Sequence, residues 1–119
     1  MVTKESIDAA LSAHSLWKKR LQDAIAKGSS EFKPQAVSTD NACEFGKWLY
    51  SLPASDTQSS DYQTVKTLHA NFHRITGGIL QLAVSGKEQE AIAKLGSGGE
   101  YSSATGKLVL ALQAWKNKL

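Results

Sequence analysis

The spacing of apolar side chains constrains this chain more than any other feature of its sequence. Apolar residues recur every three or four positions through residues 3–27, 61–85, 87–95 and 101–117, which is the period of an amphipathic helix. No segment shows the strict alternation of apolar and polar residues that marks a half-buried strand. The pattern therefore predicts an all-α fold.

Shorter segments separate the long ones. Residues 29–40 are polar and are expected to form a loop that contains about one turn of helix. A short helix is predicted over residues 42–52, capped by Thr39 or Asp40 and ended by Pro53.

Residues 54–60 read as a second polar linker, and glycines at 96, 98 and 99 interrupt the helical pattern near the end. The Gly77-Gly78 pair is expected to bend the long helix or to let another helix approach it. A chain of 119 residues is long enough for one domain. We therefore expect residues 1–119 to form a single four-helix bundle with an additional short helical segment.

Composition excludes several classes of protein. The net charge is only +3, with 14 Lys and Arg scattered among 11 Asp and Glu, which argues against nucleic-acid binding. No apolar run approaches the roughly 20 residues of a membrane span, and the start of the chain lacks a secretory signal. The single cysteine rules out an internal disulfide and suits a reducing compartment, so a cytoplasmic location is expected.

The three histidines are all placed on inward-facing positions. His69 and His73 are four residues apart, which puts both rings on one face of a helix within reach of one ion. His14 lies on the inner stripe of the first helix, where an unpartnered imidazole is costly to bury. The ordinary alternative is that they are half-buried or hydrogen-bonded core residues.

Cys43 is expected in the first turn of the 42–52 helix. With Asp40 as the cap, its sulfur would lie near the N-terminal amides, which favour the thiolate. The alternative is a small buried apolar side chain. Three imidazoles and one thiolate complete the tetrahedral shell of Zn²⁺, so the pattern favours a zinc site within the bundle.

Three sequence blocks resemble the chemoreceptor zinc-binding (CZB) domain family. They are His-x-x-Trp on the first helix, Cys-x-Phe-Gly-x-Trp on the second and His-x-x-x-His on the third, and they occur in this order as His14 to Trp17, Cys43 to Trp48, and His69 to His73. The cysteine block is the most specific of the three. The resemblance covers essentially the whole chain and implies a 3-His/1-Cys zinc site made of His14, Cys43, His69 and His73.

One position departs from the family pattern. Many members carry an acidic residue directly before the first-helix histidine, where it can orient the ring, whereas this chain has Ala13. Asp8 and Asp40 are the candidate replacements. Trp17 and Trp48 are expected to pack around the site and keep it dry.

A closed four-ligand shell leaves no open coordination position, and all three histidines are committed to it, so we expect no enzyme activity. The resemblance implies a regulatory module of chemoreceptors and diguanylate cyclases that responds to zinc or to oxidants such as hypochlorous acid. It also implies a homodimer and a signalling partner or linked output domain.

We therefore expect a zinc-binding sensory domain in which the Cys43 thiolate reacts and bundle packing changes. The alternatives are a structural zinc in a protein-interaction module without a redox role, or zinc buffering. The last helix has more apolar residues than one buried face needs and is a candidate partner surface, through Val109, Leu110, Leu112 and Trp115.

Overall fold

The computed structural model describes residues 2–41, 43–96 and 98–119, and helices are the only regular elements within them. In chain order they are α1 (Lys4–Lys27), α2 (Pro34–Val37), α3 (Glu44–Tyr50), α4 (Ala54–Thr57), α5 (Ser60–Val84), α6 (Glu88–Leu95) and α7 (Glu100–Asn117). The predicted all-α fold is confirmed.

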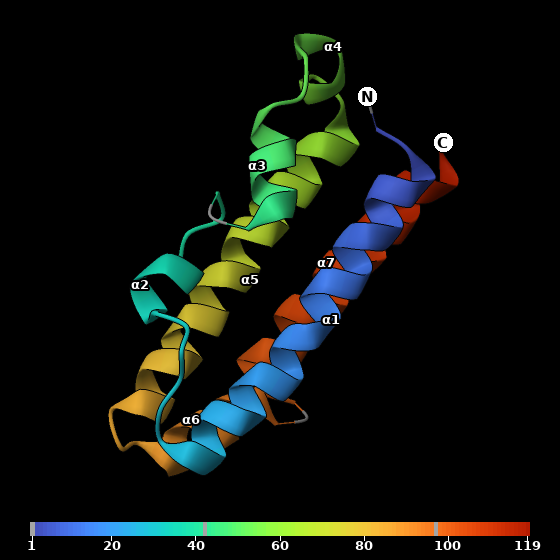
Figure 1. The fold of residues 1–119 in the computed structure, drawn as a ribbon. Helices are drawn as coiled ribbons and strands as arrows, with labels where there is room; N and C mark the ends of the chain where they lie inside the picture. Colours follow the sequence, from blue (N-terminus) through green and yellow to red (C-terminus); the bar gives the residue numbers. More distant parts are fainter. Residues whose placement is uncertain (1, 42, 97) are drawn as a thin grey trace.

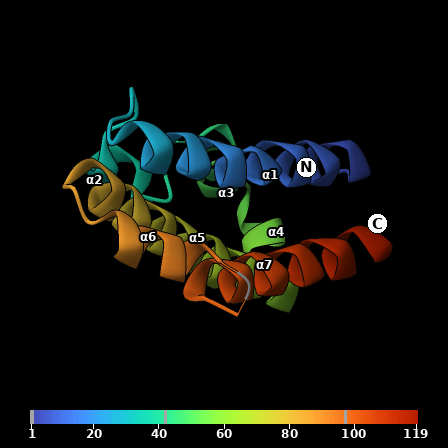
Figure 2. The ribbon, with the colours of Figure 1, turned by 90° about the horizontal axis from the view of Figure 1, so that it is seen from below.

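Three long helices, α1, α5 and α7, lie side by side, and the short helix α3 runs along α5 (Figure 1). The chain direction reverses from α1 to α3, from α3 to α5 and from α5 to α7, as in an up-and-down bundle. The view from below shows α2 near the end of α5 that leads into α6 (Figure 2). The bundle thus has α3 as a short second helix, with α2, α4 and α6 as additional segments.

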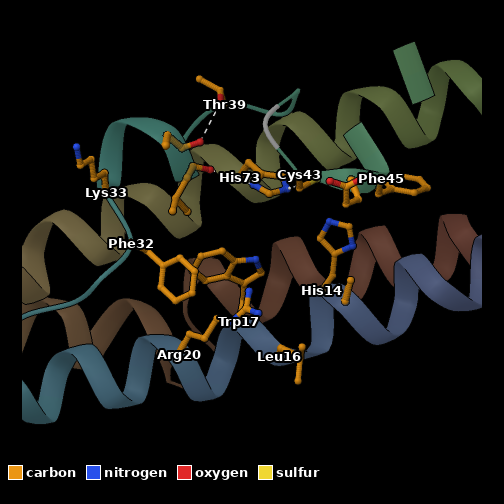
Figure 3. A pocket seen from close by; sticks show the side chains of 14 residues that line it. His14, Leu16, Trp17, Arg20, Phe32, Lys33, Thr39, Cys43, Phe45 and His73 are labelled. Atoms are coloured by element: carbon orange, nitrogen blue, oxygen red, sulfur yellow. Dashed lines mark hydrogen bonds between the residues drawn. The ribbon is translucent and has the colours of Figure 1, made fainter. Parts of the chain in front are cut away.

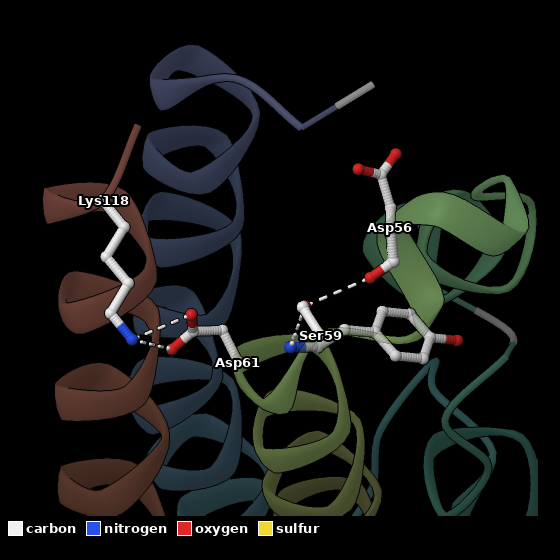
Figure 4. Close-up of polar contacts among 5 residues, drawn as sticks. Asp56, Ser59, Asp61 and Lys118 are labelled. Atoms are coloured by element: carbon white, nitrogen blue, oxygen red, sulfur yellow. Dashed lines mark hydrogen bonds and ion pairs between the residues drawn. The ribbon is translucent and has the colours of Figure 1, made fainter.

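Two ion pairs fix the end of the bundle where α7 finishes. The Lys116 ammonium lies 2.7 Å from Asp8 in α1, and the Lys118 ammonium lies 3.0 Å from both carboxylate oxygens of Asp61 in α5 (Figure 4). In the same view Ser59 caps α5, because its hydroxyl accepts the Tyr62 N–H at 3.1 Å. These contacts place the starts of α1 and α5 beside the end of α7.

The bundle interior is a continuous apolar core. The largest side chains with less than 2% exposure come from α1, α3, α5 and α7 and are Phe72, Ile7, Leu21, Leu49, Ile79, Leu80, Leu108 and Leu112, together with His69 and His73. Two imidazoles are therefore buried as deeply as the central leucines.

Several local predictions need correction. The helix predicted over 42–52 is α3, whose N-cap is Cys43 itself rather than Thr39 or Asp40; the predicted start at Ala42 lies outside the described residues. The 54–60 linker contains the one-turn helix α4, formed by hydrogen bonds from the Asp56 and Thr57 amides to the Pro53 carbonyl. Four residues are too few to show a helical period.

Close approach at the Gly77-Gly78 pair is confirmed at Gly77, although the neighbour is the residue that ends α2. A Cβ on Gly77 would lie 2.0 Å from the Ser38 hydroxyl oxygen, whereas one on Gly78 would meet nothing within 4 Å.

On α7, Leu112 and Trp115 are buried, so they do not form the expected partner surface; Leu110 is 69% exposed. Among the described helices none combines the length and the hydropathy needed to cross a membrane.

Candidate metal centre

Four potential metal ligands from three helices meet in the bundle interior. His14 comes from α1, Cys43 from the N-cap of α3, and His69 and His73 from α5. One donor atom of each residue lies within 4.8 Å of the donor atoms of the other three. The structure thus brings together all four residues that the sequence singled out.

Backbone carbonyls orient two of the imidazoles. His14 Nδ1 lies 2.7 Å from the Ala10 carbonyl oxygen, and His73 Nδ1 lies 3.0 Å from that of Val37. Since a carbonyl oxygen only accepts, each Nδ1 must carry the proton and donate it. In the neutral ring the Nε2 atom then presents a lone pair, which is the form that binds a metal ion.

Three of the donor separations are close to those of a tetrahedral zinc shell. His14 Nε2 lies 3.1 Å from His69 Nε2, and Cys43 Sγ lies 3.4 Å from His69 Nε2 and 3.5 Å from His73 Nε2. Zn–N bonds of about 2.0–2.1 Å and a Zn–S bond of about 2.3 Å at tetrahedral angles require N···N separations of about 3.4 Å and S···N separations of about 3.6 Å. The residues present therefore fit a zinc ion.

Burial keeps the imidazoles neutral. Removal from solvent lowers the pKa of His14 to about 4, against the raising effect of the Ala10 carbonyl, and lowers the pKa of His69 to about 2, with the other two histidines adding to the shift. Burial also lowers the pKa of His73, while the Val37 carbonyl opposes it. Neutral rings at ordinary pH do not need to lose a proton before they bind a cation.

Cys43 behaves differently from the sequence-based expectation. Its sulfur accepts the Gly46 N–H at 3.2 Å, so it is the cap of α3 and lies near the helix amides. Burial nevertheless raises the pKa of the thiol, and this outweighs the lowering effect of the amides. The helix terminus alone does not give a thiolate here; a bound cation would be needed to hold the sulfur deprotonated.

The expected carboxylate partners are also corrected. Asp8 pairs with Lys116, and Asp40 accepts the Tyr50 hydroxyl at 2.5 Å. The backbone carbonyls of Ala10 and Val37 do the orienting instead. His69 Nδ1 is buried without a hydrogen-bond partner among the described residues.

The sequence offered a signal for only one of these carbonyls. A buried helical histidine can reach the carbonyl four residues earlier, as His14 does to Ala10. The Val37 contact to His73 spans 36 residues and depends on how α2 docks.

Aromatic rings enclose the donors. The Phe45 ring lies 5.6 Å from the His14 ring and 5.0 Å from the His69 ring, and the Phe72 ring lies 5.2 Å from the His14 ring. Trp48 contacts this shell from outside, with its ring 5.5 Å from that of Phe45, whereas the ring of Trp17 packs on Phe32 at 5.0 Å. Phe45 is the aromatic residue of the Cys-x-Phe-Gly-x-Trp block, two residues beyond Cys43, and Phe72 lies one residue before His73. The sequence pattern thus contained both rings, but sequence reasoning gave neither of them a role beside the donors.

The comparison with protein families is consistent with this geometry. The family model of the chemoreceptor zinc-binding domain matches residues 14–80, a range that contains all four donor residues. Neither a curated protein nor a solved structure matches the chain significantly.

Proposed function

This chain belongs to the chemoreceptor zinc-binding domain family, and from that premise we propose that it is a zinc-dependent sensory domain whose reactive ligand is Cys43. His14, Cys43, His69 and His73 would hold one Zn²⁺. The observation that carries the proposal is the convergence of three neutral imidazoles and one sulfur, whose donor atoms all lie within 4.8 Å of one another, three of the pairs at 3.1–3.5 Å. Such a set of borderline-soft donors suits zinc better than magnesium or calcium.

Bound zinc would supply the positive charge that keeps the Cys43 sulfur deprotonated. Other residues of the chain orient the donors and exclude water from them. Ala10 and Val37 fix two ring orientations through their carbonyls, and Phe45 and Phe72 exclude water from the donors with buried rings. A closed set of four protein ligands favours regulation over catalysis, because no position is left for a substrate.

The oxidant response is proposed to start at the sulfur. In the net reaction the Cys43 thiolate and hypochlorous acid give sulfenic acid and chloride, so the sulfur loses two electrons and the chlorine gains them. A sulfenic acid is a poorer donor than a thiolate, and Cys43 would leave the ligand set. Cys43 is only partly buried, whereas the three histidines are buried, which makes the sulfur the accessible member of the set.

The structural consequence would begin in α3. Cys43 is the N-cap of this helix and its sulfur accepts the Gly46 N–H, so displacement of the sulfur removes both a ligand and a helix cap. The helix is only seven residues long and depends on tertiary packing for its position. We propose that a partner protein, a second copy of the chain or a linked output domain reads this movement.

Metal content tests the zinc site. Protein purified without added metal or affinity tag is analysed by plasma mass spectrometry, and we expect close to one zinc per chain. Removal by a chelator should lower the urea midpoint of unfolding, because zinc binds the folded state. Absence of metal, even after zinc is offered and the excess removed, would overturn the proposal.

Two variants separate a sensor from a structural zinc site. Cys43→His keeps four donors without a thiol, and Cys43→Ala removes one donor. We expect hypochlorous acid to release zinc from the wild type, measured with a zinc-binding dye, and to leave the zinc of Cys43→His in place. Equal release from both proteins would favour a structural role for the metal, with the oxidant acting elsewhere.

A further inference from the structure

A cleft of about 360 Å³ opens beside the donor cluster. It lies between α1, the segment that precedes α2, and α2 itself, and its wall includes His14, Cys43 and His73 at one end and Trp17, Phe32 and Arg20 at the other (Figure 3). The volume is at the lower end of the range of about 300–1,000 Å³ that is typical of small-molecule pockets. It therefore suits a ligand of one or two rings and is too small for a helix.

The walls of the cleft are mostly apolar. The rings of Trp17 and Phe32 meet edge to face with centroids 5.0 Å apart, and Leu16, Ala36 and Val37 continue the surface. Trp17 is 8% exposed, so its ring is fixed by packing. The buried Trp17 ring and the partly buried Phe32 ring offer a flat apolar body a surface on which to stack.

Positive charge lies at the end of the cleft away from the donors. The Arg20 guanidinium carbon lies 4.8 Å from the centroid of the Trp17 ring and 4.9 Å from that of Phe32. Within the described part of the chain, no carboxylate forms an ion pair with Arg20 or with Lys33, the second cation of the lining.

The single acidic residue of the lining, Glu44, lies 3.8 Å from Lys47, and its side chain is 97% exposed. The half-buried Arg20 is therefore available to an anion.

We propose that this cleft binds a small organic carboxylate, with its apolar body against Trp17 and Phe32 and its carboxylate on Arg20. The guanidinium, which already lies against both rings, offers a planar pair of donors to a carboxylate. An occupant would fill part of the cleft that Cys43 also lines and slow reagents that reach the sulfur through it. The carboxylate site is inferred from the cleft and its charges, and binding there does not require bound zinc.

Nuclear magnetic resonance with 1-naphthoate as the probe tests the site. The three tryptophans give three indole N–H signals, and we expect the Trp17 signal to shift on titration at millimolar concentration while Trp115, on the far helix, does not. The matched probe 1-naphthylmethylammonium has the same rings with the opposite charge and is expected to bind at least about tenfold more weakly. Equal affinity for the two probes, or no shift of Trp17, would overturn the proposal.

Arginine variants make the test specific. Arg20→Gln should weaken naphthoate binding about tenfold. Arg74→Gln should leave it unchanged, because Arg74 is exposed on α5 and donates only to Asn71 among the described residues. Ala36→Phe, at an exposed position of the lining, should fill the cleft and abolish binding without lowering the urea midpoint. Unchanged binding in Arg20→Gln would refute the assignment.

Protection of the sulfur gives a second readout. In metal-free protein, saturating naphthoate should slow alkylation of Cys43 by iodoacetamide several-fold, and it should not do so in Ala36→Phe. Alkylation at an unchanged rate would refute the shielding. Zinc content is measured separately on the same samples, so failure of the carboxylate site and failure of the zinc site are distinguishable.

Discussion

Gly46 is the position at which one added methyl group is expected to disturb the donor cluster without replacing a donor. A Cβ on Gly46 would lie 1.7 Å from the Asp40 carbonyl oxygen and 2.8 Å from the carbonyl carbon. Contacts under 3.0 Å are essentially never adopted by real Cβ atoms, so Gly46→Ala must move α3 away from the backbone at Asp40 by about 1.3 Å. Both neighbours are main-chain atoms, and no side-chain rotation can relieve the clash.

The expected cost follows from this displacement. Overpacking a well-packed site costs about 1–3 kcal/mol, and the better helix propensity of alanine offsets up to about 1 kcal/mol of it. A shift of this size also moves Cys43, because its sulfur accepts the Gly46 N–H at 3.2 Å. The loss of a supporting contact typically weakens metal binding about 10–100-fold, and we expect a loss in this range.

Gly78→Ala is the matched control. This glycine lies in α5, where an added Cβ meets nothing within 4 Å, so the substitution should stabilise the protein by about 0.5–1 kcal/mol. Urea unfolding of the metal-free proteins measures stability, and competition with a chelator of known affinity measures zinc binding. If Gly46→Ala matches the wild type in both assays, the close contact at Asp40 does not position Cys43, and the reasoning fails.

Three further predictions concern the core, the surface and the pH dependence. Phe72→Ala removes a ring with 0% exposure and should cost about 3–5 kcal/mol in urea unfolding; a loss below about 1 kcal/mol would contradict the packing described for this ring. Asp8→Asn breaks an exposed ion pair with Lys116 and should change stability by at most about 1 kcal/mol, with unchanged zinc affinity; a weaker zinc site would restore Asp8 as a partner of His14. The hydrogen bond to Asp40 raises the pKa of Tyr50 to about 12, so the contribution of this bond to stability is present below about pH 10 and is lost as the pH rises through 12. Ultraviolet titration should show a late phenol that is absent in Tyr50→Phe, and a Tyr50 that titrates near its ordinary pKa would contradict the bond.

The helices were largely predictable because their signals are local. The apolar period placed α1, α5 and α7 within about one residue of their observed ends. The extent of α3 was not predictable to the same degree. Its N-terminus is set by the Cys43 sulfur, which accepts the Gly46 N–H, and a cysteine cap has no strong sequence signature.

The donor residues themselves were also readable from the sequence, because periodicity puts His14, His69 and His73 on inward faces and the chain has only one cysteine. Contacts across up to 55 residues of chain decide the rest of the site. They set the distances between the donors, the ring orientations fixed by the Ala10 and Val37 carbonyls, and the protonated state favoured for the Cys43 thiol. Sequence spacing fixes which face of a helix a side chain occupies. Only the packing of α1, α2, α3 and α5 against one another decides what that face meets, how dry it becomes and which atoms lie within bonding distance of a single ion.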